Sequence, residues 1–105
     1  MASPQLEQGY TRIANSILEA LVKSNLSGAE IRAAIWIVRL TYGFNRKEMT
    51  TNVGAFATKL LSTKAYIKDI FQNLEKKNVI TLEWAGPEVC KLIFIKDFEK
   101  WKCFL

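Results

Sequence analysis

The chain has 105 residues, half of them hydrophobic, and carries 15 Lys and Arg against 10 Asp and Glu. This length fits one domain, expected to span residues 1–105, with enough apolar residues for a core that needs no metal. No segment approaches the roughly 20 apolar residues of a membrane span, and residues 1–5 lack the basic start of a signal peptide. We therefore expect a cytoplasmic protein with no membrane partner.

The residue types that most enzymes and metal sites rely on are scarce. The chain has no histidine, and its two cysteines, Cys90 and Cys103, lie thirteen positions apart. This spacing argues against a zinc site, and the lack of histidine removes the commonest general base and nucleophile partners. The five glycines form no phosphate-binding run. We expect no enzymatic activity, no cofactor and no metal, and we expect Cys90 to be a small core residue.

The N-terminal part of the chain predicts two helices. The first is expected over residues 9–24, where one apolar face is formed by Ile13, Ile17, Leu18 and Leu21. Ser27 and Glu30 form a capping box, which predicts a second helix reaching Tyr42 and ending at a left-handed Gly43. Because that helix is apolar around much of its circumference, we expect it to be the central, buried one.

Two further helices are predicted in the middle of the chain. Asn52 is suited to cap a helix over residues 53–60. Either Ser62 or Thr63 can cap the next helix, which is expected to run to about Lys77, with an asparagine following as its stop. The two helices are therefore separated by only a short turn.

The spacing of apolar residues in these two helices is typical of a helix-turn-helix. Ala57 is small enough to let the second helix approach the first, and Ile67, ten positions later, fills the gap. The apolar stripe then continues through Ile70, Phe71 and Leu74. Helical bundles without ligands also produce this spacing. In a helix-turn-helix, the polar face of the second helix is turned outward.

Three short strands complete the predicted fold. One is expected at residues 49–51, and two others at 79–84 and 89–95, joined by a turn at 85–88. Residues 97–105 are expected to pack back as a short helix or tail. Helices followed by a hairpin predict a mainly α fold with a small β-hairpin, namely a winged helix-turn-helix.

The net charge of +5 falls on the middle of the chain. Residues 39–77 carry eight basic and three acidic side chains, whereas residues 1–38 and residues 78–105 each balance to zero. A polyanionic partner accounts for such a concentration. A solvated basic face without a ligand is the alternative.

We expect double-stranded DNA to be contacted by three groups of residues. On the second helix of the helix-turn-helix, the outward residues are Thr63, Lys64, Ala65, Lys68 and Gln72. Of these, lysine suits guanine edges and glutamine suits adenine edges. Phosphates are expected to be met by Thr51 and Asn52 at the N-terminus of the preceding helix, and by the basic residues Lys59, Arg46 and Lys47. Lys91 is the basic residue nearest the tip of the hairpin. Capping alone would also explain Asn52.

Other residues fit a DNA reader less well. Leu61 occupies the turn, and a left-handed backbone there costs leucine roughly 1 kcal/mol. Asp69 places a carboxylate on the expected reading face, where it repels phosphate unless it pairs with a lysine of the same helix or a cytosine amine. The three tryptophans, Trp36, Trp84 and Trp101, are expected in the core rather than on a stacking platform for single strands.

Several segments together resemble a known family. They are Pro4-Gln5-Leu6-Glu7, the run Gly9 to Asn15, Leu18-Glu19-Ala20-Leu21, Thr41 to Asn45 with Lys47, Leu74-Glu75, and Lys96-Asp97-Phe98 with Trp101. With them the chain resembles the N-terminal origin-binding domain of bacteriophage replication protein O, the lambda-type initiator. The resemblance implies a winged helix that binds repeated sites in a phage replication origin inside the bacterial host cell, commonly as a homodimer. Helicase-loading partners are implied only for a C-terminal part of such proteins.

The chain departs from the family pattern in the turn and on the reading helix. Leu61 and Ser62 stand where the family has glycine and leucine, and Asp69 stands where the family often has arginine. Two alternatives therefore accompany origin binding. One is a winged-helix transcriptional repressor that uses the same surface. The other, which Leu61 and Asp69 favour, is a protein-interaction or inhibitor module that does not bind DNA.

Overall fold

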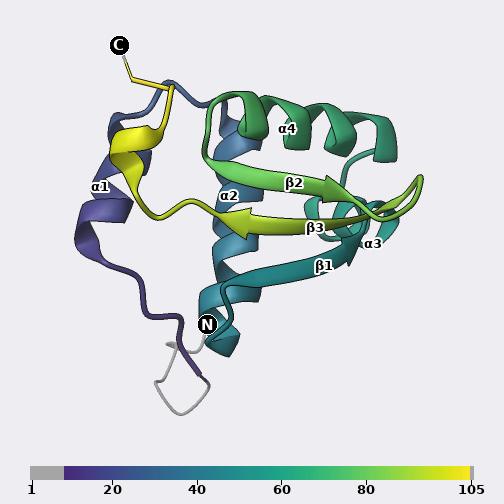
Figure 1. Cartoon of the computed structure of the whole chain (residues 1–105), viewed down its shortest axis with the longest axis horizontal. Coiled ribbons are helices and arrows are strands. Elements are labelled where there is room, and N and C mark those ends of the chain that lie inside the picture. The colour runs from purple at the N-terminus through teal and green to yellow at the C-terminus, as the bar shows by residue number, and fades with distance from the viewer. Residues whose placement is uncertain (1–8, 105) are drawn as a thin grey trace, which may run out of the picture.

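The computed structural model describes residues 9–104, and helices make up about half of that range (Figure 1). In chain order the elements are α1 (Asn15–Lys23), α2 (Gly28–Thr41), η2 (Tyr42–Phe44), β1 (Glu48–Asn52), α3 (Val53–Leu60), α4 (Lys64–Lys76), β2 (Ile80–Trp84), β3 (Val89–Phe94) and η3 (Phe98–Lys100). Within this described part, no helix is long and apolar enough to cross a membrane. The expected helices and strands of the middle and C-terminal parts are confirmed.

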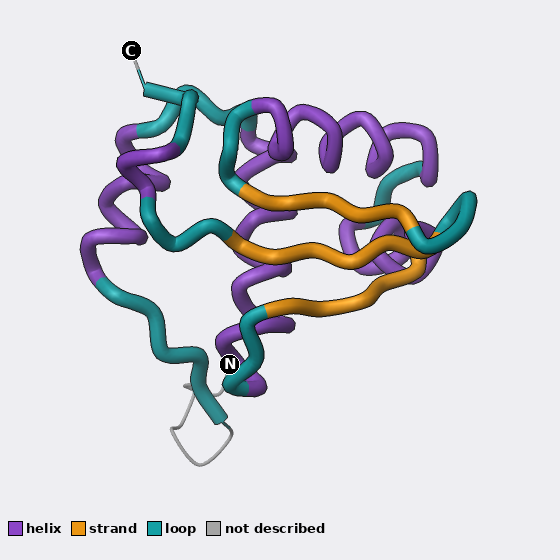
Figure 2. The backbone as a smooth tube through the Cα atoms, viewed as in Figure 1, coloured by secondary structure: helices purple, strands orange, loops and turns teal. Residues whose placement is uncertain are grey.

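The strands form an antiparallel sheet in the order β1-β3-β2. Met49 pairs with Leu92 between β1 and β3, and Leu82 pairs with the same Leu92 between β2 and β3. Residues alternate along β3, so that Cys90, Leu92 and Phe94 are buried. Figure 2 shows α2 behind the sheet, α4 beyond the edge formed by β2, and the opposite sheet face uncovered by any helix of the described residues.

The core lies between the sheet and helices α2, α3 and α4. Phe56 of α3 and Phe71 of α4 meet edge to face, with ring centroids 4.8 Å apart. Ala57 and Ile67 are both buried, as the helix-turn-helix spacing predicts. Cys90 is buried and free, which confirms its expected place in the core. Burial raises its pKa to about 11.

Local capping signals set most helix ends. Ser27 and Glu30 form the predicted capping box at α2. The Asn52 side chain accepts hydrogen bonds from two backbone amides at the start of α3, and Thr63 accepts one at the start of α4. Asn78, with φ of 60°, follows the end of α4 in a left-handed conformation. These four predictions are confirmed.

Two helix ends differ from prediction. Helix α1 begins at Asn15 rather than at residue 9, because Ala14 at the N-cap is extended and has no side chain that can cap. Ile13 instead packs on the core from the segment before the helix. After α2 the chain tightens into the 3-10 turn η2, so the left-handed residue is Asn45 (φ 54°) and not Gly43. Asparagine tolerates this conformation better than most residues.

The expected burial of α2 and of the tryptophans is only partly correct. Helix α2 is central, but Ile35 is 53% exposed and lines an apolar groove between α2 and α1. Trp84 is the last residue of β2, next to the turn that leads to β3, and is 39% exposed. Trp36 is half-buried, whereas Trp101 is buried.

Candidate nucleic-acid interface

Helix α4 buries one side and leaves the other open. Its apolar residues Ile67, Ile70, Phe71 and Leu74 are buried. The opposite side carries the expected reading residues: Thr63, Lys64, Ala65 and Gln72 are exposed, and Lys68 is half-buried. The three-residue connection from α3 begins with Leu61, which is left-handed (φ 54°, ψ 49°) and 90% exposed. Leu61 therefore adopts the left-handed backbone conformation whose cost is expected from the sequence.

Lys64 stands where three parts of the chain meet. Its Nζ lies 3.2 Å from Oε2 of Glu88 in the turn between β2 and β3. The backbone N–H of Val53, at the start of α3, donates to the Glu88 carbonyl at 2.8 Å. A Cβ on Gly54 would lie 3.1 Å from Cε of Lys64, so glycine lets the lysine rest against the start of α3. Lys64 is thereby positioned, but its charge is partly neutralised.

Other predicted residues lie close to this junction. Asn52 Oδ1 accepts from the amides of Gly54 (2.7 Å) and Ala55 (3.4 Å), so its side chain caps α3. Thr51 precedes it, half-buried at the end of β1. Any DNA role for these two residues stays a prediction.

Asp69 is exposed on α4 and lies on the expected reading face. Within residues 9–104, no Lys or Arg nitrogen lies within 4.0 Å of its carboxylate. The anticipated pairing with Lys64 or Lys68 is therefore not found, because Lys64 reaches instead to Glu88 across the fold. A negative charge thus lies beside the lysines of α4.

Lys91 is held on the uncovered sheet face. Its Nζ lies 3.4 Å from Oε2 of Glu83 on β2 and 3.7 Å from Oε2 of Glu48 on β1. The hydrogen bond to Glu83 and the charge of Glu48 raise the pKa of Lys91. Two carboxylates thus offset a charge that the sequence places near the hairpin tip.

The remaining predicted phosphate contacts lie elsewhere. Arg46 and Lys47 precede β1, whose five residues, at roughly 3.3 Å each, separate them from the Asn52 end by about 16 Å. Lys59 at the end of α3 has its Nζ 4.5 Å from the centroid of the Trp36 ring. The structure therefore does not bring these three residues together with Lys64.

Sequence reasoning missed Arg39 and Phe44. The guanidinium carbons of Arg39 and Arg46 each lie 5.0 Å from the centroid of the Phe44 ring, which is 52% exposed. The i, i+3 spacing of Trp36 and Arg39 on a helix is the signal that would have placed them side by side.

A partly buried ion pair joins α2 to α4. Lys77 Nζ lies 2.8 Å from Oε1 of Glu30, whose side chain is 6% exposed. Burial alone would raise the pKa of Glu30, but hydrogen bonds from Lys77 and from the Ser27 backbone bring that pKa below its ordinary value of 4.5. The pair thus fixes α2 and the C-terminal end of α4 relative to each other.

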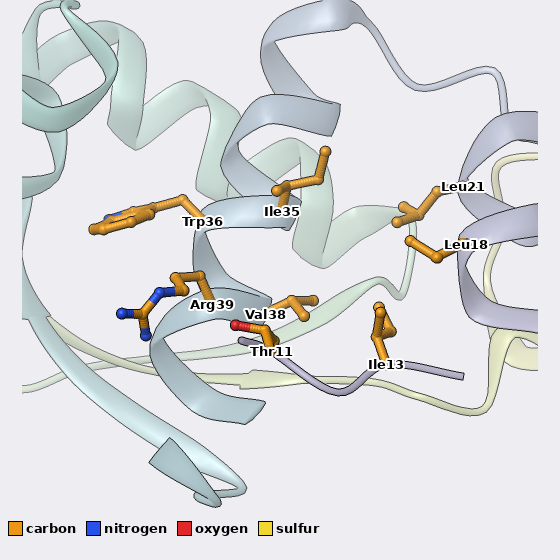
Figure 3. A pocket seen from close by; sticks show the side chains of 8 residues that line it. All are labelled: Thr11, Ile13, Leu18, Leu21, Ile35, Trp36, Val38 and Arg39. Carbon is orange, nitrogen blue, oxygen red and sulfur yellow. The ribbon is translucent and has the colours of Figure 1, made fainter. Parts of the chain in front are cut away.

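An apolar groove of about 370 Å³ runs between α1 and α2 (Figure 3). Leu18 and Leu21 line it from α1, and Ile35 and Val38 line it from α2. Trp36 and Arg39 of α2 also line the groove, with side chains that extend away from the two leucines (Figure 3). Arg39 therefore borders both this groove and the Phe44 ring.

Fold and surface together define a small helical domain with a three-stranded antiparallel sheet and a basic surface. The chain belongs to the bacteriophage replication protein O family, whose model matches residues 3–101. It is 30% identical over 99 residues to replication protein 15 of Enterobacteria phage phi80, a match over 91% of this chain and 32% of that protein. It is 42% identical over 43 residues to DNA replication protein gp18 of Salmonella phage P22, over 41% of this chain and 16% of that protein.

The chain thus spans about one third of the length of the phi80 relative. No solved structure matches it significantly. The family assignment confirms the resemblance drawn from the sequence segments.

Proposed function

We propose that this chain is a winged helix-turn-helix domain that binds duplex DNA. Helices α3 and α4 form the helix-turn-helix, and the β2–β3 hairpin forms the wing. The order of elements from α2 to β3 and the sheet order β1-β3-β2 support this reading. The observation that carries it is the exposed N-terminal turn of α4, where Thr63 caps the helix and Lys64 stands next to the hairpin turn.

In this proposal α4 enters the major groove. Lys64 and Gln72 are placed to meet base edges, because their side chains lie on the exposed side of the helix. Lys68 is placed to meet phosphates. The amides of Val53, Gly54 and Ala55 at the start of α3 already donate to Glu88 and Asn52. The domain binds DNA without catalysing a reaction.

We further propose that the DNA is a phage replication origin. The family and the names of the two relatives connect such chains with replication. A second candidate, a protein-interaction module, is favoured by two acidic features of this surface. Glu88 forms an ion pair with the ammonium group of Lys64, and Asp69 is exposed on α4, the helix that carries Lys64.

Selection of bound duplexes from a random pool, followed by fluorescence anisotropy on the selected site, tests the proposal. If about six phosphates are contacted, the logarithm of affinity should fall against the logarithm of salt concentration with a slope near −5. Lys64→Ala should weaken the selected site about tenfold, since a base-edge contact is lost. The matched control is Lys23→Ala on α1, which should change the affinity less than twofold.

Recovery of no preferred sequence, together with equal weak binding to every duplex, would contradict origin recognition. A failure to bind any duplex at 50 mM salt would contradict DNA binding as a whole. That second result would leave the protein-interaction module as the better explanation.

A further inference from the structure

A second basic surface lies apart from the outward side of α4. We call it the cation–aromatic strip and define it by five side chains that alternate in type: Lys59, Trp36, Arg39, Phe44 and Arg46. Lys59 Nζ lies 4.5 Å from the Trp36 ring centroid, and both guanidinium carbons lie 5.0 Å from that of Phe44. Trp36 and Arg39 are neighbours on α2 and point to the same side (Figure 3). The strip therefore runs from the end of α3 along α2 to the loop before β1.

The charges of the strip are not offset by acids. Within the described residues 9–104, no carboxylate lies within 4.0 Å of Lys59, Arg39 or Arg46, whereas Lys64 and Lys77 each have one and Lys91 has two. Because both arginines lie 5.0 Å from one ring, their charges are at most about one Debye length apart, ~10 Å at 0.1 M salt. Their mutual repulsion is relieved when an anion binds between them.

The strip leads into a recess of about 380 Å³. Arg46 also lines this recess, together with Lys47 and Lys96, and none of its lining residues is acidic. The hydroxyl of Tyr42, another lining residue, is buried and has no hydrogen-bond partner among the described residues. The three cations that line the recess form a suitable end point for a phosphate group.

We propose that the cation–aromatic strip binds single-stranded DNA. Unpaired bases stack on aromatic rings and on guanidinium planes, while the backbone follows a line of positive charge. A duplex does not use such a surface well, because its bases are already stacked inside the helix. The strip also lies away from the junction of Lys64 and Glu88, so it leaves the proposed duplex site free. This inference does not depend on duplex binding by α4.

Anisotropy titrations with fluorescein-labelled dT12 test the proposal on the whole chain. Arg39→Gln combined with Arg46→Gln should weaken dT12 binding at least tenfold. The matched control removes two exposed lysines elsewhere, Lys23→Gln with Lys100→Gln, and should change binding less than threefold. If Lys59, Lys47 and Lys96 contribute with the two arginines, about five phosphates are contacted. The logarithm of affinity should then fall against the logarithm of salt concentration with a slope near −3.5, since each phosphate contact to a single strand contributes about −0.7.

Tryptophan fluorescence separates stacking from attraction by charge alone. Binding of dT12 should quench the emission of the chain, and Trp36→Phe should abolish most of that quenching. Trp84→Phe should retain it, because Trp84 lies at the end of β2 and outside the strip. Circular dichroism of each variant shows whether the fold is kept, and Phe44→Leu offers a milder change if Trp36→Phe unfolds.

Three outcomes would overturn the proposal. One is an equal loss of dT12 binding in the double arginine variant and in the double lysine control. Another is quenching that survives Trp36→Phe in a folded protein. The last is a 12-base-pair duplex that competes for the strip as well as dT12 does. Lys64→Ala should leave dT12 binding unchanged, so failure of the strip and failure of the α4 site are distinguishable.

Discussion

On the outward side of α4, Lys64 is held by a carboxylate 3.2 Å away, whereas on the cation–aromatic strip Arg39 and Arg46 are held by the ring of Phe44 at 5.0 Å. Both arrangements fix a flexible cation in place. A carboxylate also neutralises the charge, while a ring leaves most of it available to a ligand. The two surfaces have the same sign of charge but differ in how much of it a polyanion meets.

The largest effect is expected from breaking the ion pair that holds α2, which carries part of the strip, against α4. Lys77→Met removes the charge that compensates buried Glu30, the link between α2 and α4. We expect a loss of about 2 kcal/mol in the free energy of unfolding, less than the roughly 3–5 kcal/mol of fully buried pairs because Lys77 is 31% exposed. Thermal unfolding should show a Tm lower by roughly 8 °C. An unchanged Tm would mean that the pair does not hold the helices together.

The same pair predicts an acid-sensitive stability. The pKa of Glu30 is lowered on folding from an ordinary value of 4.5, so its contribution is complete at neutral pH. That contribution declines as the pH falls below about 4.5 and is lost once the pH has passed through the lower pKa of the folded carboxyl group, which then takes up a proton. The free energy of unfolding, measured in urea at pH 7 and at pH 3.5, should differ less between the two pH values for Glu30→Gln than for the chain without this substitution. Equal differences would contradict the role assigned to this carboxylate.

A smaller effect tests how a carboxylate limits the α4 surface. Glu88→Gln removes the charge beside Lys64 but keeps a side chain of the same shape. Duplex affinity should rise two- to threefold, in line with the ~0.2–1 kcal/mol of exposed ion pairs. Glu99→Gln, on η3 near the C-terminal end, is the control and should have no effect. Weaker duplex binding by Glu88→Gln would show that the pair positions Lys64 more than it neutralises it.

The turn between α3 and α4 offers a change in stability with little loss of packing. Leu61 is left-handed and 90% exposed, so Leu61→Gly should relieve strain and raise the free energy of unfolding by about 0.5–1 kcal/mol. Unfolding in urea would measure this change in the free energy of unfolding. A destabilised variant would indicate that the leucine makes contacts outweighing its backbone strain.

The smallest effect is expected on the strip. A Cβ on Gly43 would lie 2.6 Å from Nη1 of Arg39, so Gly43→Ala should displace the guanidinium from the Phe44 ring. We expect about a twofold loss of dT12 affinity with no change in duplex affinity. Gly86→Ala is the control, since a Cβ there meets nothing within 4 Å. Equal affinities of the two variants would show that the position of Arg39 does not matter.

The sequence predicted those features that depend on residues close together in the chain. Capping by Ser27, Asn52 and Thr63 was visible because each cap acts on an amide two or three positions away. The start of α1 was missed because an apolar periodicity continues through residues that have no cap. Local spacing thus located most elements but not all their ends.

The candidate site was predicted less completely, because its pairings link distant parts of the chain. Lys64 and Glu88 lie 24 positions apart, and Lys59 rests on Trp36, which belongs to an earlier helix. A charge count over residues 39–77 gave the right sign but treated eight cations as one surface. Folding divides them between α4, the strip and the ion pair with Glu30.

The two cysteines offer a practical advantage. Cys103 is 1% exposed, and burial raises its pKa, as it does for Cys90. Thiol-directed dyes attack the thiolate, so the natural chain should remain almost unlabelled at neutral pH. A single cysteine introduced by Thr50→Cys or Ala65→Cys would then carry one fluorophore, and energy transfer from labelled oligonucleotides would report which surface each one occupies.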